Sequence, residues 1–334
     1  MSIAFQMLGA PGQDNALLVR VQTGQATHRL LLDCGAGCPD QLSVAELQAV
    51  DHLLFSHLHM DHVAGFDSFF RHTFNRLDRP NQIWGPPETV RIIHHRLQGY
   101  LWNLTAQLQA VWHLHDIHPH HVERRSARAS EGFAALHECG ALPHDGRPIV
   151  HHDYTVEVLR LHHGTPTLGY IVREAPRVNI DPDRLAALGL RPGPWLRQVK
   201  HPAADDDGPI DVGGELRDLG WLRETLLVET PGDSLAYLTD FSLAGGELER
   251  VAQALRGVGT LVCESQYRAA DAALARANYH ITARDAAELA ARAGVGRLVL
   301  FHLSRRYTRD EWRLLLEEAR EIFPAAEFPA EWRV

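Results

Sequence analysis

Short apolar segments that end in polar clusters characterise the first half of the chain. Leu30–Asp33 and His52–Ser56 are compact apolar runs whose length and content predict buried β-strands. Tyr154–Leu161 alternates apolar and polar residues, which predicts a strand, and Gly169–Val172 predicts the next one. From Glu88 to about His115, apolar residues spaced by three and four positions predict an amphipathic helix. These spaced residues are Val90, Ile93, Leu97, Leu101, Leu104 and Leu108.

Prolines and glycines interrupt this pattern from Glu174 to about Leu222 and break regular structure there. We interpret residues 174–222 as an inserted arm that lies outside the core. Thr282 and Asp285 then resemble a capping box, and Gly294 resembles a C-terminal cap. The other predicted elements of the second half are strands at Leu226–Glu229, Leu235–Thr239, Thr260–Cys263 and Leu298–Phe301, and helices at Glu247–Leu255 and Ala283–Ala293. Alternation of strands and helices in both halves predicts an α/β sandwich with helices outside two sheets.

Composition adds a charge argument to this picture. The chain has 334 residues, 45% of them hydrophobic, which is enough for a sizeable folded core. Its net charge of −9 argues against a general nucleic-acid-binding surface, because such surfaces are usually basic. The 22 histidines indicate metal or proton chemistry. Lys200 is the only lysine among 33 basic residues; the arginine bias suits phosphate contacts or reflects codon composition alone.

The cysteines and the apolar runs bear on the cellular compartment. The four cysteines form neither a disulfide framework nor a paired CxxC zinc motif, so we expect small core residues in a reducing cytoplasm. They are Cys34, Cys38, Cys139 and Cys263. The N-terminus has no signal-peptide pattern, and no apolar run is long enough to span a bilayer. The sequence therefore predicts a cytoplasmic protein without a membrane partner.

The segment from His57 to His62 carries the strongest chemical signal. It reads His57-Leu-His59-Met-Asp61-His62 directly after a predicted strand. Residues two apart leave a strand on the same side, so His57 and His59 can offer their imidazoles to one metal ion. Asp61 and His62 then turn toward a second metal at the start of the next helix. Two imidazoles and a carboxylate on an open site are typical of catalytic zinc.

This HxHxDH segment is the signature of metallo-β-lactamase-fold hydrolases, which the chain resembles elsewhere too. Leu31–Gly35 resembles the family's strand ending in D-x-G, and later histidines and aspartates follow strands in the family's order. The resemblance implies one domain over residues 1–334, a metallo-β-lactamase αββα four-layer sandwich with the Pro/Gly-rich arm inserted. It also implies two Zn²⁺ ions, with Mn²⁺ as an alternative. The implied ligands are His57, His59 and His163 for one metal, Asp61, His62 and His302 for the other, and Asp240 between them.

Within this fold the chain is most similar to ribonuclease Z, the endonuclease that trims tRNA 3′ ends. The segments that carry this resemblance are His163–Tyr170, Leu188–Pro194, Glu264, Tyr279–Thr282 and His302–Tyr307. The family resemblance implies a precursor tRNA or small phosphodiester substrate and a homodimer.

The resemblance also suggests catalytic roles. Asp61 would take a proton from the attacking water, while His280, backed by Glu264, would protonate the leaving oxygen. Ser304 and Arg306 would hold the scissile phosphate.

The predicted arm leaves other substrates open. Between positions 171 and 220 the chain has seven basic and nine acidic residues, and the acidic ones include Asp205–Asp207. A segment without a surplus of basic residues is poorly suited to binding an RNA backbone. One alternative is a metal-dependent hydrolase of a small substrate, such as a cyclic phosphodiester, a sulfate ester or a lactone. A second alternative is a non-enzymatic binding protein with a relic metal site.

Further histidines and tryptophans have simpler interpretations. A cluster of five histidines is predicted to lie in a solvated polar loop rather than to form a third metal site; it comprises His113, His115, His118, His120 and His121. Trp84, Trp102 and Trp112 are expected in the core, and Cys34 and Cys38 are not expected to be ligands.

Overall fold

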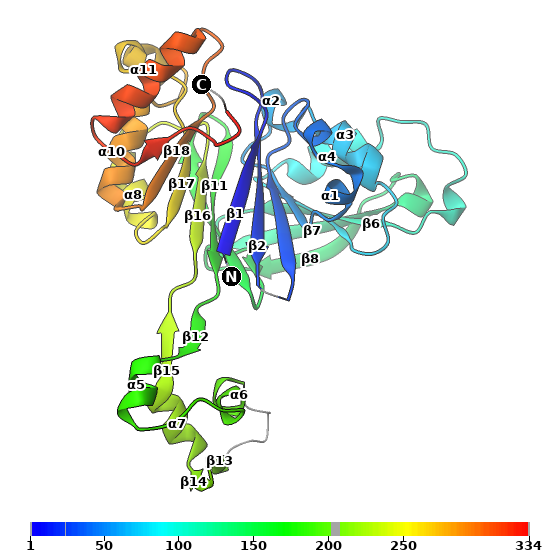
Figure 1. Cartoon of the computed structure of the whole chain (residues 1–334). Helices are drawn as coiled ribbons and strands as arrows, with labels where there is room; N and C mark the ends of the chain where they lie inside the picture. The colour runs from blue at the N-terminus through cyan, green and yellow to red at the C-terminus, as the bar shows by residue number, and fades with distance from the viewer. Residues whose placement is uncertain (1, 24, 202–207, 333–334) are drawn as a thin grey trace. The chain divides into compact units, whose positions relative to one another are not determined.

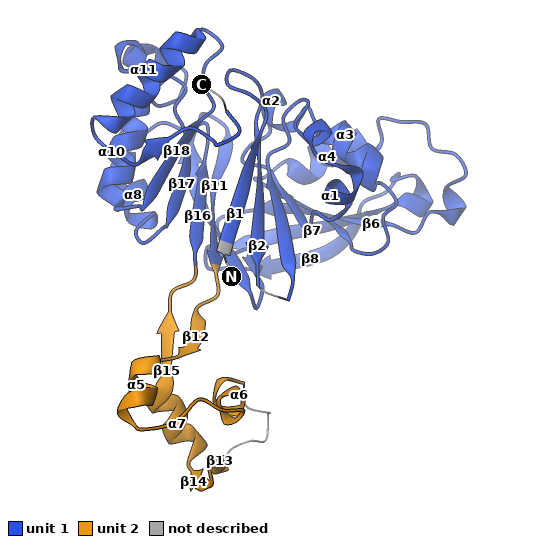
Figure 2. Cartoon of the chain, in the orientation of Figure 1, with its two compact units in different colours: residues 1–173, 233–334 blue, residues 174–232 orange. Residues whose placement is uncertain are grey.

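The computed structural model describes residues 2–23, 25–201 and 208–332. It divides into two compact units, one made of residues 1–173 and 233–334 and the other of residues 174–232 (Figure 2). The second unit begins at the residue where the sequence predicts the arm and ends at Gly232 rather than near Leu222. The acidic residues Asp205–Asp207 of the predicted arm lie outside the described residues.

The first unit contains two large sheets (Figure 1). The first sheet has the strand order β1 (Ser2–Leu8), β2 (Ala16–Gln22), β3 (Thr27–Leu32), β4 (His52–Leu54), β5 (Asn81–Gly85), β6 (Val111–Ile117), β7 (His121–Arg128) and β8 (His137–Pro143). The second sheet has the order β19 (Ala326–Glu327), β18 (Arg297–Phe301), β17 (Thr260–Glu264), β16 (Ser234–Leu238), β11 (Pro166–Glu174), β10 (Tyr154–His162) and β9 (Ile149–Val150).

Helices cover the outer faces of both sheets in Figure 1. Those of the first half are α1 (Val44–Gln48), α2 (Met60–Val63), α3 (Phe66–Thr73) and α4 (Thr89–Leu97). Those of the second half are α8 (Glu247–Ala254), α9 (Ala272–Ala277), α10 (Ala283–Ala293) and α11 (Arg309–Arg320). The predicted capping box of α10 is confirmed: Thr282 accepts from the Asp285 backbone N–H, and Gly294 caps the helix in a left-handed conformation.

Strand alternation separates two hydrophobic cores. In β3, Leu30 and Leu32 belong to the core that also holds the inward residues of the second sheet. Leu31, between them, points to the other side and packs in the core with Phe66 and Ile93, from α3 and α4. Burying both faces of the strand is what a central strand of a layered α/β fold requires. A hydrogen bond also links the two halves of the sandwich: the Leu168 N–H in β11 donates to the carbonyl of Ser56, which follows β4, at 2.8 Å.

Parallel pairing brings the chemically active segments to one edge. Strands β3, β4, β5 and β6 pair in parallel with one another, and so do β16, β17, β18 and β19. The carboxyl ends of parallel strands lie at the same edge of a sheet, where ligands of α/β proteins commonly bind. The segments after β3, β4, β16 and β18 therefore meet there.

The long helix predicted from Glu88 to His115 is wrong beyond Leu97. Helix α4 ends there, and residues 111–117 form strand β6. Leu101 and Leu104, which completed the helical spacing, are fully or largely exposed at 102% and 86%. The segment Val111–Ile117 also alternates, with Trp112 and Leu114 buried, and the pairing with β5 and β7 decides in favour of the strand.

The prediction that the histidine cluster lies in a polar loop is also wrong, because strands β6 and β7 form a hairpin there. His113 and His115 lie in β6, and His121 begins β7. His115 is buried, stacks on Trp84 with ring centroids 3.7 Å apart, and contacts the Ile83 carbonyl at 2.8 Å. Trp84 and Trp112 are core residues as predicted, whereas Trp102 is only partly buried.

The second unit is a small αβ unit with its own core. Its strands are β12 (Arg177–Ile180), β13 (Ile210–Val212), β14 (Glu215–Arg217) and β15 (Leu227–Thr230), and its helices are α5 (Pro182–Ala187), α6 (Trp195–Lys200) and α7 (Leu219–Leu226). Trp195, Val199 and Leu222 are buried together in it. The described residues of the stretch in which the sequence has many prolines and glycines therefore form short helices and strands.

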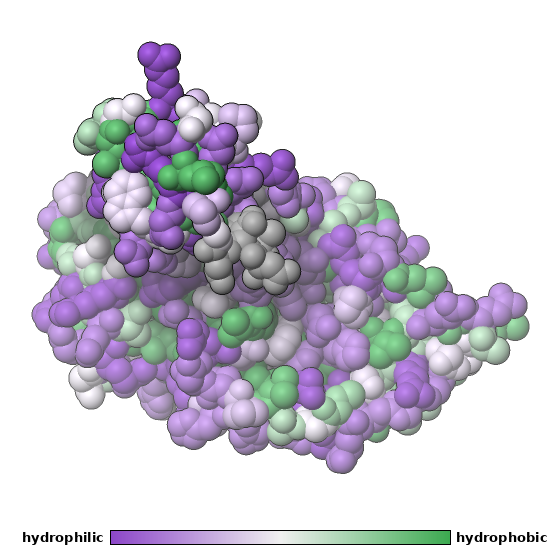
Figure 3. All heavy atoms as spheres, turned by 90° about the horizontal axis from the view of Figure 1, so that it is seen from below, coloured by the Kyte–Doolittle hydropathy of each residue, from purple (hydrophilic) through white to green (hydrophobic). Residues whose placement is uncertain are grey.

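The surface is mainly polar. The face drawn in Figure 3 is mostly hydrophilic, with small separate hydrophobic spots. Among the described residues, no helix combines the length and the apolar character needed to cross a bilayer.

Candidate metal centre

Strand ends position the candidate ligands. His57 lies three residues beyond the end of β4. His163 directly follows β10, and His302 directly follows β18. Asp61 and His62 lie in the first turn of α2, as predicted for the second half of the motif. Asp240 and His302 adopt left-handed backbone conformations, with φ of 51° and 55°. Such conformations are strained for residues with a Cβ and cluster at functional sites, where they direct a side chain out of its strand.

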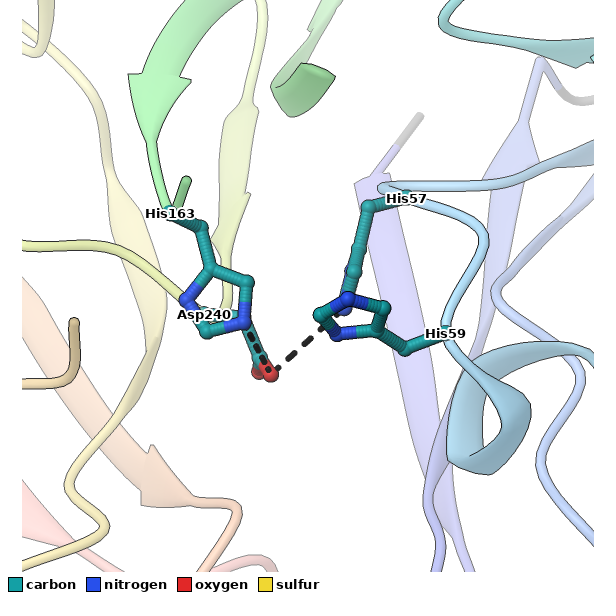
Figure 4. Close-up of side chains that lie close together, drawn as sticks. All are labelled: His57, His59, His163 and Asp240. Carbon is teal, nitrogen blue, oxygen red and sulfur yellow. Dashed lines mark ion pairs between the residues drawn. The ribbon is translucent and has the colours of Figure 1, made fainter. Parts of the chain in front are cut away.

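One group of candidate ligands comprises His57, His59, His163 and Asp240 (Figure 4). The ligand atoms of these four residues lie within 4.8 Å of one another. Asp240 Oδ2 is 3.6 Å from His57 Nε2 and 3.5 Å from His163 Nε2. Figure 4 shows the side chains of His57 and His59 approaching from one side and those of His163 and Asp240 from the other.

The second group comprises Asp61, His62, Asp240 and His302. Here the other oxygen of Asp240 is the shared atom: Oδ1 is 3.5 Å from His62 Nε2 and 3.3 Å from His302 Nδ1. Asp61 Oδ2 lies 3.6 Å from His62 Nε2 and 3.7 Å from His302 Nε2. The structure thus brings all seven predicted ligands together, with one carboxylate facing both groups.

Two observations show that these donors fit divalent cations. First, the nitrogen–oxygen separations of 3.3–3.7 Å within the groups are longer than ordinary hydrogen bonds. They match the spacing of neighbouring ligands around a tetrahedral ion, which is about 3.4 Å for bonds of about 2.1 Å. Second, the Nε2 atoms of His57 and His62 are buried and lack a hydrogen-bond partner among the described residues. Buried polar atoms normally have one.

The outward nitrogens of three imidazoles are held by neighbours. His57 Nδ1 contacts Ser56 Oγ at 3.1 Å, His62 Nδ1 contacts Asp33 Oδ2 at 2.8 Å, and His163 Nδ1 contacts the Tyr279 carbonyl at 3.0 Å. When Nδ1 carries the proton and donates, Nε2 keeps its lone pair. The Nε2 lone pairs therefore face the space beside Asp240, as metal coordination requires.

Burial and charge set the protonation of the centre. Burial, followed by the neighbouring His62, lowers the pKa of His57 to about 2, so its imidazole is neutral. Burial alone would raise the pKa of Asp240, but the surrounding imidazoles, His302 first, hold it well below its usual value. Burial opposes protonation of His62, but Asp240 and then Asp33 outweigh it and hold the pKa of His62 well above its usual value. His62 must therefore give up its proton when a metal binds, because neutral imidazoles and ionised carboxylates are the forms that bind metal.

Asp33 contacts the candidate ligand His62 but is not among the site residues predicted from the sequence. It is fully buried with φ of 61°. Its Oδ2 accepts hydrogen bonds from Ser56 Oγ and Tyr237 OH, each at 2.8 Å, and also contacts His62 Nδ1. Its Oδ1 accepts from the Ser56 N–H at 2.6 Å. Asp33 therefore fixes the orientation of His62; an acidic residue closing an apolar strand was the available signal.

His280 and Glu264 lie beside the centre as a hydrogen-bonded pair. His280 Nδ1 is 2.9 Å from Glu264 Oε2, and Glu264 Oε1 accepts from the Phe241 N–H at 2.7 Å. The His280 ring centroid is 5.0 Å from that of His163 and 5.7 Å from that of His302. Burial opposes protonation of His280, but Glu264 outweighs it and the pKa rises to about 9.

A cavity of about 590 Å³ opens on the second group of ligands. Met60, Asp61, His302 and Ser304 line it together with Arg305. The predicted phosphate contact Arg306 is not among its lining residues; its guanidinium lies over the Tyr267 ring and 3.7 Å from Asp271. Arg305, which the sequence interpretation passed over, pairs with Asp14 at 2.9 Å.

Comparison with known proteins identifies relatives along the whole chain. A ribonuclease Z from Deinococcus radiodurans is 49% identical over 330 residues, covering 99% of this chain and 98% of the relative. A ribonuclease Z from Bradyrhizobium diazoefficiens is 32% identical, covering 95% and 91%. The family model described as Anti-Pycsar protein Apyc1 matches residues 4–142.

Solved structures confirm the predicted fold. The metallo-β-lactamase fold protein YhfI from Bacillus subtilis superposes with a TM-score of 0.57 at 15% identity, covering 98% of this chain and 96% of that protein. The short form of human tRNase Z superposes with a TM-score of 0.51 at 16% identity, covering 92% and 94%. At these identities the likeness concerns the fold, and the chain has the metallo-β-lactamase fold.

Proposed function

Because the chain belongs to the ribonuclease Z family, we propose that it is a metal-dependent endoribonuclease that cuts precursor tRNA at the 3′ end. The family supports a hydrolase that acts on RNA phosphodiester bonds. The observation that carries the proposal is the carboxylate of Asp240, whose two oxygens face two separate groups of histidine and aspartate ligands. The two ligand groups would hold a pair of divalent cations, and such a pair would support an in-line displacement at phosphorus.

The seven ligands would hold two divalent cations. His57, His59 and His163 would bind one, Asp61, His62 and His302 the other, with Asp240 between them. Imidazole and carboxylate donors support Zn²⁺, with Mn²⁺ as the alternative. When bound, such cations supply Lewis acidity, which makes water a nucleophile near neutral pH and neutralises charge on a phosphate.

The side chains of Asp61 and His280 are proposed to move the protons. Asp61 lines the cavity with a side chain 44% exposed, and its carboxylate is proposed to take a proton from the attacking water. His280 is proposed to give a proton to the leaving oxygen. Its partner Glu264 is fully buried and holds Nδ1, which leaves Nε2 as the atom that donates.

The substrate phosphate is proposed to bind at the cavity wall. Ser304 lines the cavity and would donate through its hydroxyl. Arg306 is 42% exposed on its side chain and is proposed to reach the phosphate by leaving its stacked position over Tyr267. Arg305 lines the cavity, whereas Arg306 does not, so Arg305 is an additional candidate for binding the phosphate.

The cellular setting follows from the substrate. We propose a cytoplasmic enzyme because its proposed substrate is a precursor tRNA, and we propose a homodimer because the family resemblance supports one. Light scattering of the purified chain measures the dimer directly, and a monomer mass at working concentration would reject it.

Parallel cleavage assays test the proposed function. Metal-loaded protein is offered a 3′-extended precursor tRNA and a chromogenic phosphodiester, with His59→Ala as the metal-ligand variant. His95→Ala, on the exposed face of α4, is the matched control for removal of a histidine. Cutting at the tRNA 3′ end by wild type and His95→Ala, but not by His59→Ala, is expected. Cutting at other positions only would reject the assignment of substrate.

A small phosphodiester substrate is the second candidate. It is favoured by the excess of acidic over basic residues between positions 171 and 220, nine against seven, because RNA binding draws most of its non-specific affinity from basic contacts. Turnover of the chromogenic diester with intact precursor tRNA would support this candidate and leave the metal centre unaffected.

A further inference from the structure

A second group of histidine and aspartate side chains lies away from the metal centre, in the first unit. It comprises His28, His151 and Asp153, whose candidate ligand atoms all lie within 4.8 Å of one another. His28 is near the start of β3, whereas Asp33 follows the end of that strand. Five residues of extended chain separate them, which is roughly 16 Å at about 3.3 Å per residue. Asp153 likewise precedes β10, whereas His163 follows it.

Three imidazoles surround one carboxylate oxygen in this group. Asp153 Oδ2 is 2.9 Å from His28 Nε2, 3.1 Å from His152 Nε2 and 3.7 Å from His151 Nδ1. The rings of His28 and His151 have centroids 4.5 Å apart, and those of His151 and His152 are 4.0 Å apart. Two imidazoles and a carboxylate are the donor set of zinc and related transition metals.

The backbone around the group is already ordered. The His151 N–H donates to the Tyr154 carbonyl at 2.9 Å, and the Asp153 N–H donates to His151 Nδ1 at 3.2 Å. The second bond holds the His151 ring beside Asp153, with Nδ1 3.7 Å from Asp153 Oδ2. Since the turn that carries His151 and Asp153 is held by its own hydrogen bonds, little ordering entropy remains to be lost when an ion binds.

Burial and the neighbouring imidazoles favour the neutral form of His151. The side chains of His28 and Asp153 are each only 17% exposed. Burial, then His152 and His28, lower the pKa of His151. Burial, then His151 and His28, lower the pKa of the adjacent His52 to about 4. Imidazoles that lie this close together disfavour one another's protonation. A divalent ion, in contrast, can bind several neutral imidazoles at once.

We propose that His28, His151 and Asp153 form a third, non-catalytic site for a divalent transition-metal ion of the zinc type, with His152 available as a fourth ligand. The site joins β3 of the first sheet to the turn before β10 of the second sheet. A bound ion therefore cross-links the two sheets at the end remote from the metal centre and stabilises the folded state by mass action. This inference is independent of the proposed function.

Metal stoichiometry distinguishes this site from a hydrogen-bonded cluster. The full chain is stripped with a chelator and titrated with Zn²⁺ against a chromophoric competitor, and with Co²⁺ by visible absorption. Wild type is expected to bind one equivalent more than Asp153→Asn and than His28→Asn. The His95→Ala control should bind as many equivalents as wild type. Equal stoichiometry in wild type and both variants overturns the proposal, whether a third equivalent is present or absent throughout.

Thermal unfolding supplies the second measurement. Zn²⁺ should raise the unfolding temperature of wild type more than that of Asp153→Asn, while both hydrolyse the chromogenic diester at equal rates. His151→Gln replaces Asp153→Asn if that variant does not fold, as judged by circular dichroism. Equal zinc-induced shifts overturn the cross-link. Failure of the wild type itself to cleave precursor tRNA would count against the proposed function and leave the difference in stoichiometry interpretable.

Discussion

Replacing Glu264 with glutamine tests how His280 is kept protonated. Glu264 is fully buried, and its two oxygens have separate partners, the Phe241 N–H at 2.7 Å and His280 Nδ1 at 2.9 Å. Glutamine has the same shape, so the cavity does not change. The buried Phe241 N–H requires an acceptor, which places the amide oxygen there and turns the amide NH₂ group toward His280. The NH₂ group donates to Nδ1, so the proton on Nδ1 is lost.

The magnitude follows from the pKa of His280. Burial lowers this pKa, and Glu264 is the largest of the influences that raise it to about 9. Without the carboxylate the pKa of His280 falls below its ordinary value of about 6.5. At pH 7.5 the protonated fraction then drops from nearly all to about a tenth or less. Full loss of a general acid slows turnover by about 10² to 10⁴-fold, so Glu264→Gln should lower kcat by at least about tenfold.

The pH profile of kcat is the assay for this prediction. For wild type, the acid form is fully present below its pKa and is lost as pH rises, so the alkaline limb lies toward pH 9. For Glu264→Gln the limb moves below about pH 7, and activity recovers on acidification. KM and metal content should not change. His280→Ala sets the maximal loss, and the double variant should lose no more than His280→Ala alone.

If kcat falls in Glu264→Gln but the alkaline limb of its pH profile does not move, the explanation through the pKa of His280 is refuted. That result would make Glu264 a packing residue. An unchanged kcat would remove His280 from the reaction, and a loss of metal would show that the pair supports the ligands instead.

Three further predictions concern the metal ligands and acid stability. His59→Ala should abolish hydrolysis and lower metal content; activity equal to wild type would contradict the ligand assignment. Asp33→Asn, which weakens the orientation of His62, should reduce metal affinity by about 10 to 100-fold in a chelator competition, and wild-type affinity would exclude that role. His52 is half-buried, and burial followed by His151 and His28 lowers its pKa to about 4, below the unfolded value of about 6.5. The stability that it contributes is therefore present above pH 6.5 and is lost as pH falls toward 4. The loss amounts to about 3 kcal/mol, and urea unfolding of the metal-free His52→Gln variant should show a flatter pH dependence over that window; an identical slope would assign the acid sensitivity to other groups.

Local pattern was sufficient for the elements that surround the metal centre. The apolar runs before Asp33 and His57 predicted buried strands, and the structure has β3 and β4 there. A polar cluster that follows a strand can be recognised from the sequence, because the neighbouring residues alone show that it lies at a strand end. Local pattern failed at residues 98–117, where leucines at helical spacing overlap an alternating segment. There the choice depended on pairing with β5 and β7, which lie elsewhere in the chain.

The sequence alone could therefore determine which residue types stand at which strand ends, because hydrophobic periodicity and motif spacing are local properties. The family resemblance implied Asp240 between the two metals, but only the tertiary structure could show which of its oxygens faces each ligand group and that Asp33 orients His62. It alone also brought His28 within 2.9 Å of Asp153, across 125 residues of sequence. Coordination and hydrogen bonding depend on distances of a few ångströms between residues far apart in the chain, and the packing of two sheets sets those distances.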